Sequence, residues 1–220
     1  MIVQASPQYG LALHTTSPEL GLALSNFAGD ERCQTWELGR ALSTHLHSYL
    51  LQFLLPRTWQ DLKFIAVAKG PGSFTGTRIG VVTARVLAQQ LGMPLYGIST
   101  LAALAWSQGA ELLADKQSVD VAVQMAAQRG EVFAAIYRLA ESRVQVVREE
   151  RAIAPTTWQH TLDTWPCPYQ LIEADAHLGY AATHLLDMAE QAWQQGNRPP
   201  VSETLPFYGQ HPVDKMRGAP

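Results

Sequence analysis

Short apolar runs separated by polar turns dominate the first part of the chain, and they predict strands. The runs YGLALHTT (9–16) and LGLALSNF (20–27) are joined by Ser-Pro-Glu, a turn signal typical of a tight hairpin. We expect a third extended segment over 32–38, a buried strand over 64–69 and another over 94–98. The pattern indicates a sheet that begins as a meander.

Two longer segments have apolar residues at helical spacing and predict helices over 38–55 and 75–91. The second helix should end at Gly92, because glycine favours the end of a helix and Pro94 follows it. A third helix is expected over 99–108, capped by Ser99 or by Thr100.

The second half of the chain repeats this order of elements. We expect strands over 119–125, 131–139 and 143–150, followed by a helix after Pro155. A strand over 169–174 and a long helix over 176–196 complete the order. Strands mixed with crossover helices favour a mixed sheet flanked by helices. We therefore expect a duplicated α/β unit, with one lobe over 1–110 and a second over 111–220 that ends in a proline-rich tail.

Composition narrows the class of protein. Of the 220 residues, 47% are hydrophobic and 16% charged, and the net charge is −3, so a large core is expected and a basic nucleic-acid-binding stripe is not. The cysteines, Cys33 and Cys167, have neither metal-ligand nor disulfide spacing. No apolar run reaches the roughly 20 residues of a membrane span. We expect a soluble, cytoplasmic protein with no membrane contact.

The loop between strand 64–69 and helix 75–91 contains the candidates for phosphate or nucleotide contact, which are Gly70, Gly72, Ser73, Thr75 and Gly76. Backbone N–H groups at a helix start favour anions, and glycines permit a close approach. The loop nevertheless differs from the P-loop, dinucleotide and nucleophile-elbow templates. A phosphate contact and a tight turn capped by Ser73 or Thr75 both remain open, and a nucleophilic Ser73 lacks identifiable partners.

The stretch KGPGSFTGTRIG (69–80) resembles the signature of the TsaB (YeaZ) family of bacterial tRNA-modification proteins. Three further stretches are similar, in the same order, to the family's opening hairpin, second-half strand pair and C-terminal motif: LALHTTSPELGLAL (11–24), AAQRGEVFAAIY (126–137) and LPFYGQHPV (205–213). The resemblance spans nearly the whole chain. It implies the two-lobed actin-like ATPase (ribonuclease H-like) fold.

The resemblance also implies a function. It points to a non-catalytic scaffold subunit of the complex that transfers threonylcarbamoyl to the adenosine beside the tRNA anticodon. The implied partners are TsaD, which carries the metal and transfers the group, and the small ATPase TsaE, with tRNA reached only through the complex. ATP or ADP, where bound, is expected at the joint with TsaD. An active small-molecule kinase of the same fold and a peptidase acting on a partner remain alternatives.

Two positions depart from the family pattern. His14 stands where many relatives have an Asp, and Ala126 stands at a second acidic position. Because a hard cation prefers oxygen ligands, these substitutions remove the expected Mg²⁺ anchors. We therefore expect no metal site, no catalytic residue and no autonomous ATP hydrolysis in this subunit.

Both predicted helices have more apolar positions than one sheet-facing stripe requires. We hypothesise that the surplus packs against the equivalent helices of TsaD, or against a second copy of the chain. Complete burial within this chain is the alternative. The candidates for the partner interface are Leu50, Leu54, Gly80, Val81, Ala84, Arg85 and Ala88.

Overall fold

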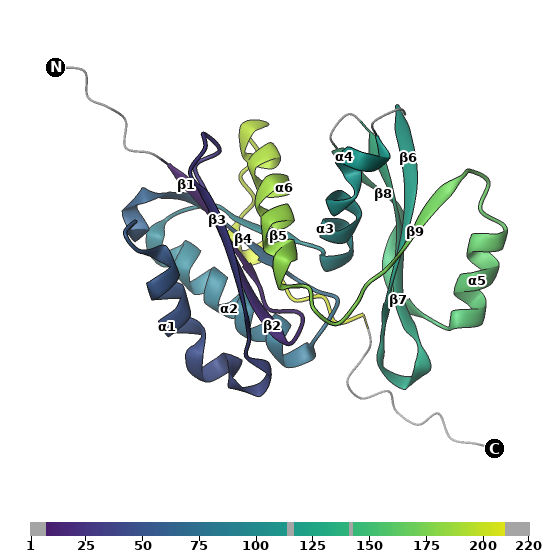
Figure 1. Cartoon of the computed structure of the whole chain (residues 1–220), viewed down its shortest axis with the longest axis horizontal. Coiled ribbons are helices and arrows are strands. Elements are labelled where there is room, and N and C mark those ends of the chain that lie inside the picture. Colours follow the sequence, from purple (N-terminus) through teal and green to yellow (C-terminus); the bar gives the residue numbers. More distant parts are fainter. Residues whose placement is uncertain (1–7, 114–116, 141–142, 210–220) are drawn as a thin grey trace.

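The computed structural model describes residues 8–113, 117–140 and 143–209, and Figure 1 shows two β-sheets flanked by helices. The first sheet has the strand order β3-β2-β1-β4-β5. Its first three strands form an antiparallel meander, and β4 and β5 continue the sheet parallel to β1. The strand bounds are β1 Tyr9–His14, β2 Glu19–Ser25, β3 Glu31–Glu37, β4 Leu62–Ala68 and β5 Leu95–Ile98.

The alternation of side chains along the strands gives the first sheet two apolar faces. Leu11 and Leu13 of β1 lie in one core cluster with α1 (Leu42–Leu54) and α2 (Phe74–Leu91). Ala12, between them, lies in a second cluster with α6 (Ala182–Gln194). Because successive side chains of a strand point to opposite faces, one strand serves both layers. Figure 1 shows α1 and α2 on one side of this sheet and α6 on the other.

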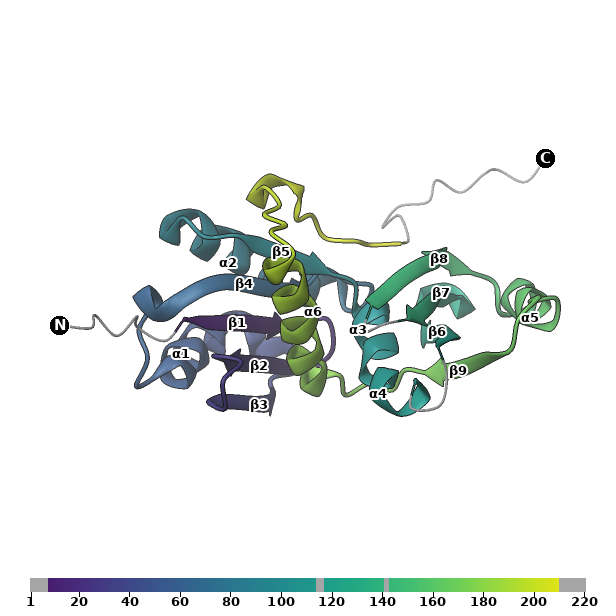
Figure 2. The same cartoon turned by 90° about the horizontal axis from the view of Figure 1, so that it is seen from above.

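The second sheet has the order β8-β7-β6-β9 and repeats the antiparallel meander, with β9 parallel to β6. Its strands are β6 Ser118–Ala126, β7 Val132–Ala140, β8 Arg143–Ile153 and β9 Tyr169–Glu173. Helix α3 (Thr100–Ser107) packs on one face and lies between the two sheets, while α5 (Pro155–Asp163) packs on the other face (Figure 2). A short helix, α4 (Gly109–Leu112), follows α3.

The element order predicted from the sequence is confirmed, as is the α/β class with two mixed sheets flanked by helices. Ser99 caps α3 as expected, because its hydroxyl accepts hydrogen bonds from the N–H groups of Leu101 and Ala102. Short 3-10 turns, not foreseen, join several elements: η1 Gly39–Ala41, η2 Trp59–Asp61, η3 Gln128–Gly130, η4 Gly179–Ala181 and η5 Val201–Glu203.

The packing differs from a simple division of the chain at residue 110. Helix α6, from the second half of the sequence, buries Leu185, Leu186 and Ala189 in one cluster with Phe64 and Tyr96 of the first sheet. The segment after α6 also returns there, since the Phe207 N–H donates to the Lys69 carbonyl. Without α6, the second face of the first sheet would lack an apolar cover.

Residues 210–213 of the predicted C-terminal motif lie outside the described residues. Among the residues that are described, no helix is both long and apolar enough to cross a membrane.

Candidate functional site

The glycine-rich loop joins β4 to α2 and is tied to the β1–β2 turn. The Ser73 N–H donates to the Thr16 carbonyl at 2.7 Å. The Ser73 hydroxyl caps α2 by accepting the Gly76 N–H at 3.2 Å, and the Gly76 carbonyl accepts from the Thr15 hydroxyl at 2.8 Å. Ser73 is therefore the N-cap, and Thr75 lies exposed in the first turn of the helix.

Close approach within the chain explains two of the glycines. Gly72 has a φ of +153°, and a Cβ there would lie 2.2 Å from the Thr16 carbonyl oxygen. A Cβ at Gly80, on α2, would lie 2.1 Å from the Thr15 hydroxyl oxygen. Real Cβ contacts are longer than this, so both positions require glycine for α2 to pack against the β1–β2 turn. Gly70, earlier in the loop, accepts the Thr100 N–H through its carbonyl.

A cavity of about 300 Å³, which we call the intersheet cavity, lies where the two halves of the chain meet. The β1–β2 turn and the glycine loop form one wall, and the ends of β6 and β9 form the other. Its lining is largely neutral and contains a single carboxylate, that of Asp175, which accepts the His177 N–H at 2.7 Å. The residues that line it are Thr16, Ser17, Pro18, Gly72, Ser73, Met125, Ala126, Ala174, Asp175, Ala176 and Leu178.

His14 lies at the end of β1 beneath this cavity and has no exposed surface. Its Nε2 is 3.0 Å from the Thr16 hydroxyl, which is 3.0 Å from the Thr100 hydroxyl. The described residues offer Nδ1 no hydrogen-bond partner. Burial lowers the pKa of the His14 imidazole from 6.5 to about 3, so the ring is neutral at physiological pH. A neutral imidazole thus occupies the position at which the family pattern has a carboxylate.

The remaining candidates for chemistry are a metal site, a nucleophilic Ser73 and an acid–base role of His14. No group of three His, Cys, Asp or Glu side chains within the described ranges is arranged to hold a metal ion. The Ser73 hydroxyl accepts a backbone N–H as a helix cap, and His14 is hydrogen-bonded to Thr16. These contacts give both side chains structural partners.

The predicted partner-interface residues require a correction. Most of them are buried in the chain's own core and face the first sheet: Leu50, Leu54, Gly80, Val81, Ala84 and Ala88. Arg85 is half-buried. These positions cannot present side chains to a partner, because the sheet already covers them.

A different set of apolar side chains on the same helices is exposed. Leu51 and Leu55, at the end of α1, are 56% and 64% exposed, and Val82 and Val86 of α2 are 57% and 53% exposed. We call these four residues the outer stripe. The sequence therefore predicted the surplus of apolar positions on both helices, but the residues chosen as interface candidates were mostly the buried ones.

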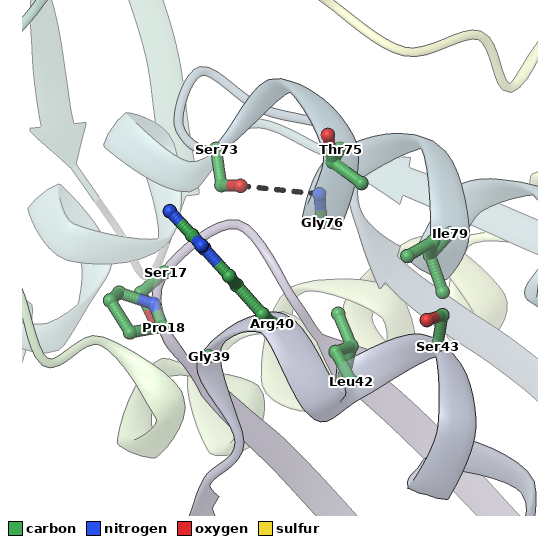
Figure 3. A pocket seen from close by; sticks show the side chains of 10 residues that line it. All are labelled: Ser17, Pro18, Gly39, Arg40, Leu42, Ser43, Ser73, Thr75, Gly76 and Ile79. Atoms are coloured by element: carbon green, nitrogen blue, oxygen red, sulfur yellow. Dashed lines mark hydrogen bonds between the residues drawn. The ribbon is translucent and has the colours of Figure 1, made fainter.

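A second cavity, of about 380 Å³, lies between the first turn of α2, the start of α1 and the β1–β2 turn. We call it the Arg40 cavity. Figure 3 shows the Arg40 side chain extending across it toward Ser73 and Ser17. Leu42 and Ile79 form its apolar end.

Sequence reasoning missed Arg40, although a signal was present. Acidic residues are absent from 38–60 and from 62–110. The acidic residues flanking Arg40 in sequence are therefore Glu37 before it and Asp61 after it. A search for long stretches of one charge sign would have directed attention to it.

Comparison with known proteins identifies relatives. A family model described as TsaD, tRNA N6-adenosine threonylcarbamoyltransferase, matches residues 50–190. The tRNA threonylcarbamoyladenosine biosynthesis protein TsaB of Bacillus subtilis is 32% identical over 121 residues, which are 54% of this chain and 49% of that protein. The TsaB protein of Escherichia coli is 30% identical over 167 residues, 67% of this chain and 71% of that protein. The match thus spans about half the length of the Bacillus protein and more of the Escherichia protein.

The structural comparison agrees. YeaZ from Pseudomonas aeruginosa superposes with a TM-score of 0.73 at 24% identity, covering 91% of this chain and 99% of that one. The two-lobed architecture that the resemblance implied, an actin-like ATPase fold, is confirmed at the level of the fold.

Proposed function

This chain belongs to the TsaB (YeaZ) family, and on that premise we propose that it is a scaffold subunit in the biosynthesis of threonylcarbamoyladenosine in tRNA. Its task is to hold a catalytic partner of the TsaD type in working form. The group transfer itself takes place on that partner. The observation that carries this proposal is the outer stripe, a set of aliphatic side chains left uncovered on two adjacent helices.

The outer stripe supports a protein partner on physical grounds. Single exposed apolar residues are ordinary, but here two large aliphatic side chains are exposed on α2 and two more at the end of α1, and both helices lie on the same side of the first sheet (Figure 1). Helices with exposed apolar stripes bury them by packing ridges into the grooves of other helices. We propose that α1 and α2 pair in this way with two helices of TsaD, and that a second copy of this chain covers the patch when TsaD is absent.

The remaining partners follow from the same premise. TsaE is proposed to join the TsaB–TsaD pair, and tRNA to be gripped mainly by the other subunits, because this chain carries a net charge of −3. ATP or ADP is proposed to bind, where it binds, at the joint with TsaD, and the intersheet cavity of this chain takes part only through its hydroxyl lining. We propose a cytoplasmic location, where these partners act on tRNA.

An active small-molecule kinase of the same fold remains the second candidate, since the intersheet cavity lies at the junction of two similar sheets. Against it stand two substitutions near that cavity: Ala126, which lines it, and the buried His14 at the end of β1 occupy the positions of the family's carboxylates. Magnesium-dependent ADP release by the purified chain alone would favour this candidate over the scaffold.

Reconstitution tests the proposal. TsaD and TsaE from the same source are assayed for modification of tRNA with and without this chain, and with a variant carrying Val86→Asp. We expect modification only with the parent chain. Full activity without the chain, or with the Val86→Asp variant at equal concentration, would contradict the scaffold role.

A further inference from the structure

The Arg40 cavity has a cation at its wall. Arg40 lies in the turn η1, its side chain is exposed, and no described residue is recorded as its hydrogen-bond or ion-pair partner. Its guanidinium extends toward the Ser73 hydroxyl, and Ser17 also lines the cavity (Figure 3). A guanidinium beside hydroxyl groups suits an oxyanion, because it offers planar paired donors and the hydroxyls complete the shell.

The surroundings of the cavity have an uneven charge distribution. Although the chain is acidic overall, residues 38–60 and 62–110 contain no Asp or Glu and include Arg40, Arg78 and Arg85. These segments contain α1, α2 and the glycine loop. Helices α1 and α2, the turn before α1 and the glycine loop thus contribute cations and no carboxylate, which favours an acidic partner surface.

The cavity is continuous with the outer stripe. Thr75 and Ile79 of α2 line the cavity. Val82 and Val86 follow at helical spacing, seven and eleven residues after Thr75, so all four lie on one face of α2. A partner that covers the outer stripe thus reaches the mouth of the cavity.

We propose that the TsaD-type partner inserts an acidic side chain, Asp or Glu, into the Arg40 cavity, where its carboxylate pairs with Arg40. This inference rests on the proposed function, since it assigns a specific contact to the same docking surface. The carboxylate carbon chain lies against Leu42 and Ile79, and the charge lies at the guanidinium. The pair fixes the register of an interface that is otherwise aliphatic and tolerant of sliding.

The neighbouring side chains favour a protein over a nucleic acid as the source of the oxyanion. Single-stranded RNA is held by aromatic stacking and a basic groove, and double-stranded RNA by multiple phosphate contacts. The exposed ring of Phe74, at the start of α2, already packs against Tyr208 and Arg78. Farther along α2, the surface offers the aliphatic side chains of Val82 and Val86. These bury well against another protein but do not stack on bases.

The test measures binding of purified TsaD to the full-length chain by calorimetry. Arg40→Gln should weaken binding by about tenfold or more, and Arg40→Lys by less, because lysine keeps the charge and loses the paired donors. The matched control is Arg143→Gln, the same change of charge at an exposed position on β8, which should leave affinity unchanged. Binding by Arg40→Gln should also depend less on salt than binding by the parent chain.

Further outcomes separate this inference from the proposed function. If Val86→Asp abolishes binding while Arg40→Gln binds like the parent, the docking surface stands and the acidic anchor is overturned. If neither change affects binding, the docking surface itself is wrong. If Arg40→Gln leaves TsaD binding intact but lowers affinity for tRNA alone, the oxyanion is a phosphate and the inference is overturned in favour of RNA.

Discussion

The intersheet cavity and the α1–α2 surface differ in the side chains that they offer to a ligand or a partner. The cavity lies at the junction of the two sheets, yet its wall combines the hydroxyls of Thr16, Ser17 and Ser73 with apolar side chains such as those of Met125 and Leu178. The α1–α2 surface holds the Arg40 cavity, where Arg40 has no ion-pair partner among the described residues, and next to it the exposed outer stripe. The side chains best suited to bind a protein partner, Arg40 and the four of the outer stripe, therefore lie on the α1–α2 surface and not in the intersheet cavity.

Ser73 lies between these regions and shows how they are connected. It lines both cavities, and its backbone is tied to the β1–β2 turn through Thr16. The glycine loop therefore sets the position of α2 relative to the first sheet, and with it the outer stripe. The glycine loop, whose shape would suit a phosphate, thus serves here to orient α2.

The largest effect is expected from a charge placed on the outer stripe. Val82→Asp combined with Val86→Asp should weaken TsaD binding by about a thousandfold or more, because it buries unpaired carboxylates in an aliphatic interface. The midpoint of thermal unfolding should change little, since both side chains are exposed in the free chain. Calorimetric titration gives the affinity.

The control for this change lies on the second sheet. Val146 and Val147 of β8 are 54% and 40% exposed, so Val146→Asp with Val147→Asp is the same double change away from α1 and α2. It should leave TsaD affinity unaltered. Equal losses from the two double variants would show that the partner does not distinguish the surfaces.

The next effect concerns the glycine loop. Gly72→Ala should destabilise the fold by about 3 kcal/mol, because the new Cβ meets the Thr16 carbonyl in addition to the cost of a positive φ. Gly92 has a φ of +65° and nothing within 4 Å of its Cβ position, so Gly92→Ala reports the backbone cost alone, about 1 kcal/mol. Urea unfolding measures both. Equal losses would contradict the close-approach explanation.

A smaller, pH-dependent effect is expected from His14. Its pKa is 6.5 when unfolded and about 3 when folded, so the unfolded chain binds the extra proton between these values. Stability should therefore rise with pH up to about 6.5, with a His14 contribution of about 1.4 kcal/mol per pH unit well below that value. His14→Asn should reduce the slope of unfolding free energy between pH 5 and 6.5. His47→Gln, a change at an exposed histidine of α1, should leave it unchanged.

The smallest effect is the loss of a helix cap. Ser73→Ala removes the acceptor for the Gly76 N–H and should cost about 1 kcal/mol of unfolding free energy. Ser73→Asp should restore most of it, because Asp also caps well. A loss much larger than that, or no rescue by Asp, would indicate that Ser73 does more than cap α2.

These comparisons also show what the sequence could supply. Periodicity predicted the helices and strands because their apolar spacing is regular, and Ser99 and Gly92 marked helix ends through local capping chemistry. Which of two aliphatic stripes faces the sheet was not predictable, since Leu50 and Leu51 are adjacent and chemically identical. Only the position of the sheet decides that Leu50 is buried and Leu51 is exposed.

The site was harder to predict for the same reason. The Arg40 cavity joins η1, the β1–β2 turn and the start of α2, which are distant in sequence. No local sequence pattern predicts that Arg40 and Ser73 line the same cavity. The position of α6 was also not predicted, because the return of the chain to the first sheet is a property of the topology and not of the local sequence.

The central claim is that the outer stripe, and not the intersheet cavity, is the surface that meets the partner. Methyl NMR of the chain with labelled Leu, Val, Met and Ala tests it directly as TsaD is added. We predict large shifts at Leu51, Leu55, Val82 and Val86, with little change at Met125 and Ala126, which line the cavity. Shifts confined to Met125 and Ala126, with the four outer-stripe methyls unmoved, would contradict the account.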